Sequence, residues 1–200
     1  QARDYRICGF PPPSSGAIAV GQILGILGHT PAANLPLQGG LPDADWLHLY
    51  TEAARLAFAD RAQYLGDPDF VPAPAGQWSS LLAPEYLAGR ARLIGQAPGA
   101  ASMKTAQPGN PGGMKTSFAP MADQIEYGTS HISIVDAQGR AVAMTTTIED
   151  VFGARQMVNG FLLNNELTDF SFAPADASGA PMANRVQPGK RPRSSMAPTL

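Results

Sequence analysis

The stretch that decides the fold is residues 128–147, which read GTSHISIVDAQGRAVAMTTT. Side chains alternate between two faces over 129–135 and again over 140–148, with the period of two that is typical of β-strands. The residues between them, Asp136-Ala137-Gln138-Gly139, form a turn signal. The sequence therefore predicts a β-hairpin with a three-residue loop, in which Gly139 takes the left-handed backbone conformation.

The register of this hairpin brings two threonines together. With a loop over 137–139, Val135 faces Ala141, and counting back along both strands places Thr129 opposite Thr147. Directly opposed residues have Cβ atoms about 4.5–5.5 Å apart, which is close enough for a bond between two threonine hydroxyls. We therefore expect paired hydroxyls at the open end of the hairpin.

Thr129 is a candidate nucleophile at this open end. A threonine hydroxyl needs a base, and a threonine that begins a chain can use its own α-amine. Because Thr129 lies within the chain, the Gly128–Thr129 peptide bond has to be cleaved first. Gly128 has no Cβ and so tolerates a strained carbonyl for the hydroxyl to attack. On spacing alone, the alternative that Thr129 merely starts a strand stays open.

The first half of the chain reads as mainly helical. The patterns predict a short strand over 5–10 and helices over 17–27, 46–64 and 84–93. Ser14 and Ser15 are expected to cap the first helix, and Asp43 or Asp45 the second. Together with the hairpin, these elements predict an α+β fold.

The chain divides by composition into three regions. Residues 1–97 are the helical region, and 98–128 form a flexible linker rich in Pro, Gly, Ser, Met and Ala without sustained periodicity. Residues 129–200 begin with the hairpin. A long linker that ends at the Gly128–Thr129 step, where strand patterning begins, indicates a processing site.

Two polar clusters follow the hairpin. The apolar run at 161–163 is expected to be a buried strand, and Glu166 and Asp169 after it could bind a substrate ammonium group. Ser194 and Ser195 follow a basic stretch and could hold a carboxylate. A polar turn and a solvated loop are the respective alternatives.

Composition excludes several classes of function. The chain is 44% hydrophobic and 15% charged with a net charge of -2, so it offers no basic surface for nucleic acid or an anionic membrane. No apolar run reaches the 18 or so residues of a membrane span. Cys8 is the single cysteine and is expected to be a small buried hydrophobe. The histidines show no ligand spacing, so no metal site is predicted.

Five motifs in order resemble the γ-glutamyltranspeptidase (glutathione hydrolase) family over nearly the whole chain. They are Pro11-Pro12-Pro13-Ser14-Ser15-Gly16, Ala59-Asp60-Arg61-Ala62-Gln63-Tyr64-Leu65-Gly66-Asp67-Pro68-Asp69-Phe70, Gly128-Thr129-Ser130-His131, Leu162-Leu163-Asn164-Asn165-Glu166 and Lys190-Arg191-Pro192-Arg193-Ser194-Ser195-Met196. The resemblance implies an N-terminal-nucleophile hydrolase, built as a four-layer αββα sandwich and made as a precursor that cleaves itself. Residues 1–128 would then end the large subunit, and 129–200 would begin the small one.

The resemblance also assigns roles to individual residues. Thr129 matches the nucleophile that forms a γ-glutamyl ester, and Thr147 matches the threonine that supports it. Glu166 and Asp169 match the pair that holds the glutamyl α-amino group, whereas Ser194 and Ser195 match the pair that holds its α-carboxylate.

The partners implied are small molecules and the rest of the parent protein. They are glutathione or another γ-glutamyl compound, an amino-acid or peptide acceptor, and the remaining segments of both subunits. No metal or organic cofactor is implied, and the expected location is periplasmic or secreted.

The chain departs from the family pattern in three ways. Glu149 stands where better-studied members carry an asparagine that helps to hold the glutamyl group, which puts strict γ-glutamyl selectivity in doubt. The chain ends before the family's Gly-Gly oxyanion turn and begins after its substrate-clamping arginine, so we expect the isolated chain to be a poor enzyme or none. A related acylase acting on glutaryl or β-lactam side-chain amides, and a non-catalytic binding relative, are the alternatives.

Overall fold

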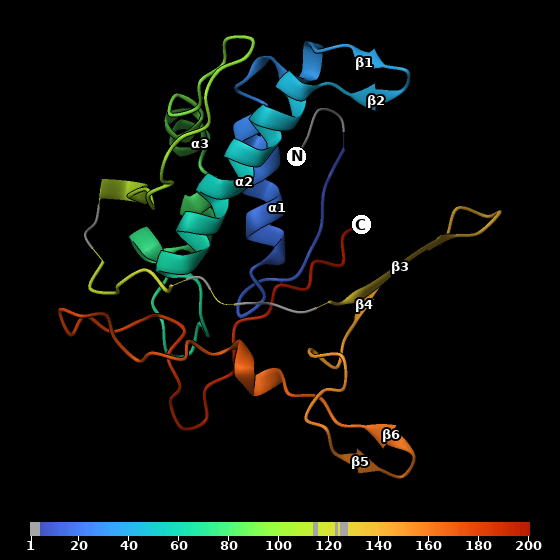
Figure 1. Ribbon diagram of the computed structural model, residues 1–200, viewed down its shortest axis with the longest axis vertical. Coiled ribbons are helices and arrows are strands. Elements are labelled where there is room, and N and C mark those ends of the chain that lie inside the picture. Colours follow the sequence, from blue (N-terminus) through green and yellow to red (C-terminus); the bar gives the residue numbers. More distant parts are fainter. Residues whose placement is uncertain (1–4, 114–115, 123, 125–127) are drawn as a thin grey trace.

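The computed structural model describes residues 5–113, 116–122, 124 and 128–200. Among these residues, three α-helices lie in the first half of the chain, and the longest strands lie in the second half (Figure 1). This mixture agrees with the predicted α+β class. In chain order the elements are α1 (Gly16–Leu27), η1 (Pro31–Asn34), β1 (Leu37–Gln38), β2 (Leu41–Pro42), α2 (Ala44–Tyr64), η2 (Pro74–Gly76), η3 (Trp78–Leu82), α3 (Pro84–Ala91), η4 (Pro111–Gly113), β3 (Ser130–Val135), β4 (Ala141–Thr146), β5 (Met157–Val158), β6 (Phe161–Leu162) and η5 (Glu166–Asp169).

The core lies between α1, α2 and α3. The predicted apolar stripe of α2 is buried, since Leu49, Ala53 and Leu56 are at most 2% exposed. These side chains pack with Ile26 of α1 and Leu87 of α3 in one hydrophobic cluster. Burial of this kind contributes about 25 cal/mol for each Å² of apolar surface removed from water.

The helix boundaries confirm most of the sequence-based expectations. Asp43 is the cap of α2, because its carboxylate accepts from the Trp46 backbone N–H at 2.8 Å. Ser15 stands at the N-cap of α1, but its side chain makes no capping hydrogen bond. The Ser15 hydroxyl instead donates to the carbonyl oxygen of Ser194 at 2.8 Å, so a contact distant in sequence replaces the expected local one.

The predicted strand over 5–10 is wrong. Only Tyr5 in this stretch lies in a β-bridge, and Cys8 exchanges two backbone hydrogen bonds with Leu200, of 2.7 and 3.0 Å. Cys8 is also exposed, contrary to the expected burial. The three prolines that follow lack N–H groups, so the pairing cannot continue as a ladder.

Several residues between 98 and 124 make hydrogen bonds to α2. The Met103 N–H donates to Glu52 at 2.8 Å, the Gly109 N–H to Asp60 at 2.7 Å, and the Met121 N–H to the Ala62 carbonyl at 3.0 Å. Both acceptor carboxylates are buried in the helix. These contacts place Met103, Gly109 and Met121 along one helix, whereas the three-part division of the chain stays a prediction.

Two hairpins extend away from the helices (Figure 1). In β3–β4 every residue of β3 is exposed. The expectation of a buried strand at 161–163 is wrong, since Phe161 is 60% exposed and β6 pairs with the two-residue β5 in a small hairpin. Asn159 and Gly160 both have positive φ and form the turn between them, as Asn-Gly pairs commonly do in hairpins.

Candidate active site at the Gly128–Thr129 junction

The hairpin register predicted from the sequence is confirmed. Val135 pairs with Ala141 and Ser130 pairs with Thr146, so Thr129 and Thr147 are the next residues beyond the last pair. Gly139 adopts a φ of +80°, and its N–H donates to the Asp136 carbonyl oxygen at 3.0 Å. Thr129 is exposed and lies immediately before β3.

Thr147 contacts the bond before Thr129. Its hydroxyl donates to the carbonyl oxygen of Gly128 at 3.5 Å, a long hydrogen bond, in place of the expected bond between two threonine hydroxyls. In general, a hydroxyl that donates to a carbonyl oxygen stabilises the negative charge that develops there when a nucleophile attacks the carbonyl carbon.

Gly128 itself is not restricted to glycine by its surroundings. A Cβ built on it would meet no atom within 4 Å, and its φ lies outside the left-handed range. The strained carbonyl suggested for this position therefore stays a prediction without support from its backbone angle.

Glu149 connects Thr147 to the acidic segment. Its N–H donates to the Thr147 hydroxyl at 2.8 Å, while its carboxylate accepts from the Asn165 amide at 2.5 Å and from the Thr168 hydroxyl at 3.3 Å. Glu149 has a φ of +73°, a conformation that costs a residue with a Cβ about 1–2 kcal/mol. This backbone is held in place because Asn165 also accepts from the Asp150 N–H at 2.9 Å.

Glu166 and Asp169 are the first and last residues of the 3₁₀-helix η5. Side chains three positions apart eclipse one another in such a helix, so both carboxylates lie on the same side of the turn. Both residues are half-buried. Their role in binding a substrate ammonium group stays a prediction.

Asn184 links this acidic turn to the serine motif. It is 1% exposed, and its amide donates to the Asp169 carbonyl oxygen at 2.6 Å. Its side-chain oxygen accepts from the Arg193 N–H at 3.0 Å. Asp169 and Ser194 are therefore joined through one buried side chain and one peptide unit.

Ser194 and Ser195 lie against α1 and α2. The Ser194 hydroxyl accepts from the Met196 N–H at 3.2 Å, and the Ser195 hydroxyl accepts from the Arg61 guanidinium. The Ser14 hydroxyl of the proline-serine motif donates to the Met196 carbonyl at 2.7 Å. Three of the five sequence motifs thus meet at this point.

A salt bridge anchors the same segment to the end of α2. Asp67 is fully buried and accepts from the Arg191 backbone N–H at 2.7 Å and from its guanidinium at 2.5 Å and 3.0 Å. Hydrogen bonds from the Arg191 side chain hold the pKa of the Asp67 carboxyl well below its usual range. Burial lowers the pKa of the neighbouring Lys190 to about 8.

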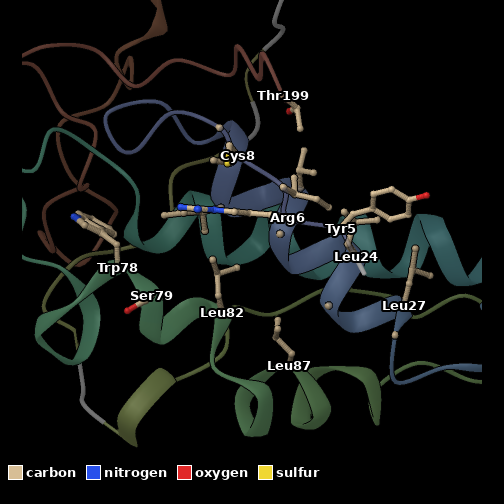
Figure 2. Close-up of a pocket in the computed structure, with 18 of the residues that line it drawn as sticks. Tyr5, Arg6, Cys8, Leu24, Leu27, Trp78, Ser79, Leu82, Leu87 and Thr199 are labelled. Atoms are coloured by element: carbon tan, nitrogen blue, oxygen red, sulfur yellow. The ribbon is translucent and has the colours of Figure 1, made fainter. Parts of the chain in front are cut away.

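A large apolar cavity lies elsewhere. It has a volume of about 1020 Å³ and lies beside α1, η3 and α3, where apolar side chains such as Leu24, Leu82 and Leu87 point into it (Figure 2). None of the predicted site residues is among the described residues that line it. Within the described part of the chain, no group of three or more His, Cys, Asp or Glu side chains is arranged to hold a metal ion.

Comparison with known proteins decides the family. The family model for gamma-glutamyltranspeptidase matches residues 1–200. The chain belongs to the γ-glutamyltranspeptidase family. The resemblance stated from the five motifs is thereby confirmed, and the chain is part of a family of enzymes.

Relatives in this family include both hydrolases and acylases. The chain is 39% identical to the glutathione hydrolase proenzyme of Bacillus subtilis (strain 168) over 98% of its own length and 32% of the relative's. The glutathione hydrolase proenzyme of Escherichia coli (strain K12) is 37% identical, over 99% of this chain and 32% of the relative. The Acylase ACY 1 proenzyme of Pseudomonas sp. (strain SE83) is 34% identical, over 99% of this chain and 31% of the relative. The chain therefore spans about a third of the length of these γ-glutamyltranspeptidase-family proteins.

A solved structure supports the fold. The crystal structure of cephalosporin acylase from Bacillus halodurans matches with a TM-score of 0.69 and 24% identity, covering all of this chain and 30% of that one. At this identity the likeness concerns the fold alone. No helix in the described part of the chain has the length and apolar character of a membrane span.

Sequence reasoning missed the residues that hold this γ-glutamyltranspeptidase-family site together. Arg61, Asp67 and Asn184 make the contacts that fix the serine motif and the acidic turn. Arg61 and Asp67 stood within a recognised motif but had no assigned role. Their spacing could not reveal partners that lie 134 and 124 positions away.

Proposed function

We propose that this chain carries the nucleophile and part of the acyl-binding site of a γ-glutamyl hydrolase and transferase. The observation that carries the proposal is the Thr147 hydroxyl at the Gly128 carbonyl oxygen, one residue before Thr129. In this position Thr147 stabilises an oxyanion during attack by Thr129. The family matches over the whole chain add independent support.

Activation begins with self-cleavage. The Thr129 hydroxyl oxygen attacks the Gly128 carbonyl carbon, and the C–N bond to Thr129 breaks as the nitrogen takes up a proton. Water then hydrolyses the resulting ester, leaving a carboxylate on Gly128 and a free α-amine on Thr129. That amine becomes the base for the next attack.

Turnover repeats the same chemistry on the substrate. The Thr129 hydroxyl gives its proton to the α-amine and attacks the γ-carbonyl of glutathione or another γ-glutamyl amide. The amine leaves with a proton, and the γ-glutamyl ester on Thr129 remains. Water resolves the ester in hydrolysis, and an amino acid or peptide resolves it in transfer.

The substrate is held at its two charged groups. The α-ammonium group lies against Glu166 and Asp169, with Glu149 as a third carboxylate nearby. The α-carboxylate accepts hydrogen bonds from the hydroxyls of Ser194 and Ser195. The connections through Asn165 and Asn184 support this arrangement because they fix the acidic residues relative to the threonine and serine motifs.

The complete site draws on further segments of both subunits. The relatives are about three times as long as this chain, and Ile132, Ile134 and Val142 of the hairpin are each more than 40% exposed. We propose that such segments cover these side chains and complete a four-layer αββα sandwich, and that the isolated chain has little activity. A periplasmic or secreted location is proposed from the family alone.

A related acylase activity is the second candidate. The 34% identity to an acylase proenzyme favours it, and so does Glu149, which stands where the family resemblance leads us to expect an asparagine. Because a glutaryl group keeps the carboxylate but lacks the α-amine, the two activities make different demands on the acidic residues.

The test compares three p-nitroanilides in the full-length gene product. The γ-glutamyl compound carries both charged groups, the glutaryl compound carries only the carboxylate, and the 4-aminobutyryl compound carries only the amine. The proposal predicts that kcat/KM is highest for the γ-glutamyl compound. Higher kcat/KM for the glutaryl compound would favour the acylase, and no turnover of any of them together with an uncleaved chain would favour a non-catalytic relative.

A further inference from the structure

Arg61 of α2 lies at the centre of the contacts around the serine motif. It is buried, and its Nε donates to the Ser15 hydroxyl at 3.0 Å while its Nη2 donates to the Ser195 hydroxyl. One guanidinium therefore ties the start of α1 to a serine that lies 134 positions further along the chain.

We propose that Arg61 is a positioning residue for a carboxylate subsite formed by Ser194 and Ser195. The proposal rests on the proposed function, since it deepens the role of these serines. It extends to any acyl group with a terminal carboxylate, whether or not that group also carries an α-amine.

The direction of the hydrogen bonds supports this role. A hydroxyl has one proton to donate and two lone pairs with which to accept. Because the Ser195 oxygen accepts from Arg61, its own proton points away from the guanidinium. Donation from a charged group also polarises the hydroxyl and strengthens it as a donor to a further acceptor.

Arg61 also fixes Ser194, through its backbone. The Ser15 hydroxyl accepts from Arg61 and donates to the Ser194 carbonyl oxygen at 2.8 Å. The Ser15 N–H donates to the same oxygen, also at 2.8 Å. The two serines are thus held from one side by α1 and α2, and Arg61 is the residue common to both connections.

A second buried arginine contacts the backbone of Arg61. Arg193, also buried, donates to the Arg61 carbonyl oxygen at 3.1 Å and brings a second positive charge to the same region. Lysine cannot reproduce the fork that reaches both Ser15 and Ser195.

The test compares Arg61→Gln and Arg61→Lys with the wild type in the full-length gene product, using the same three p-nitroanilides. We expect KM for the γ-glutamyl and glutaryl compounds to rise about 10-fold or more, because a hydrogen bond to a charged group is lost or misdirected. KM for the 4-aminobutyryl compound should stay within about two-fold, since it has no carboxylate to place. The affinities for glutarate and 4-aminobutyrate, measured by calorimetry, give the same comparison without any chemical step.

Two further variants separate positioning from general damage. Arg55→Gln removes another arginine of α2, whose contacts are to Glu52 and the Met103 carbonyl rather than to the serines, and should leave the substrate preference unchanged. Combining Arg61→Gln with Ser195→Ala should cost less than the sum of the single changes, because both remove the same interaction.

The outcomes distinguish this inference from the proposed function. Equal losses for all three compounds, no change in KM, or additive effects with Ser195→Ala would overturn the role of Arg61. A wild type that prefers the glutaryl compound would overturn γ-glutamyl selectivity. The role of Arg61 would then be tested by the KM values of the Arg61 variants for the glutaryl compound. A wild type that neither turns over the anilides nor binds glutarate would overturn both.

Discussion

The hydroxyl of Thr147 lies 3.5 Å from the carbonyl oxygen of Gly128, across the open end of the β3–β4 hairpin. This hydrogen bond joins the residue that follows β4 to the peptide bond that precedes β3. The hairpin register places Thr147 there, and the Glu149 N–H orients its hydroxyl oxygen at 2.8 Å. The proposed self-cleavage depends on this relationship, because the Gly128 carbonyl is the group that Thr129 is proposed to attack.

Removal of the Thr147 hydroxyl should slow self-cleavage. We expect Thr147→Ala to reduce the rate by about 10- to 100-fold, because the oxyanion on Gly128 loses a donor. Intact mass measured over time in the full-length gene product follows the reaction. Thr145→Ala is the matched control, since that hydroxyl contacts His131 at 2.8 Å instead. Equal rates for both variants would contradict the role of Thr147.

Neutralising Glu149 should change selectivity between amine-bearing and amine-free acyl groups. With Glu149→Gln we expect KM for the γ-glutamyl anilide to rise about three- to five-fold, a modest effect because the carboxylate is partly solvated. The glutaryl anilide should be unaffected or improved. Asp150→Asn removes a neighbouring carboxylate whose contact is the Val151 N–H, at 2.6 Å, and should change neither KM. A parallel change in both substrates would count against a role for Glu149 in binding the amine.

A methyl group at Gly16 should disturb the serine motif. A Cβ there would lie 2.5 Å from the Ala197 Cβ and 2.6 Å from the Met196 carbonyl oxygen. We expect Gly16→Ala to lower the free energy of unfolding by about 1–3 kcal/mol, measured in urea. Gly89→Ala in α3 meets no atom within 4 Å and should instead stabilise by up to about 1 kcal/mol. Similar values for the two variants would show that the close approach at Gly16 relaxes freely.

The Asp67–Arg191 salt bridge should make stability depend on pH. The pKa of Asp67 is lowered in the folded chain from an ordinary value of 3.8. The unfolded chain therefore binds the proton first as the pH falls, so the stabilisation is complete above this value and is lost below it.

Asp67→Asn removes this contribution. We expect a loss of about 1–3 kcal/mol at pH 7 in urea unfolding, moderated because Arg191 is 54% exposed. The loss should shrink as the pH falls below about 4. Asp69→Asn is the control, because Asp69 contacts the same guanidinium but is mostly exposed. A loss that is independent of pH would contradict the assignment to an ion pair.

The parts of the fold that follow from neighbours in sequence could be predicted. The β3–β4 register follows from alternation and from Gly139, and the start of α2 follows from Asp43. The strand predicted at 161–163 failed as a buried strand because an apolar run does not reveal which segment covers it. The Asn159-Gly160 pair was the available signal for the hairpin observed there.

The connections of the site depend on contacts that spacing does not encode. Ser15 was expected to cap α1, but its hydroxyl is used by Ser194 and Arg61. Asn184 lies in a loop without periodicity, so nothing in its local sequence indicates that it joins Asp169 to Arg193. The motifs predicted the candidate site residues, and the tertiary structure shows how those residues are connected.

The central claim is that Thr129 attacks the carbonyl of Gly128. The most direct test is the intact mass of the full-length gene product after prolonged incubation, beside Thr129→Ala and Thr129→Ser. The account predicts that the wild type is cleaved between Gly128 and Thr129, that the alanine variant stays whole, and that the serine variant is cleaved more slowly. Cleavage of the alanine variant at the same bond, or an intact wild type, would contradict it.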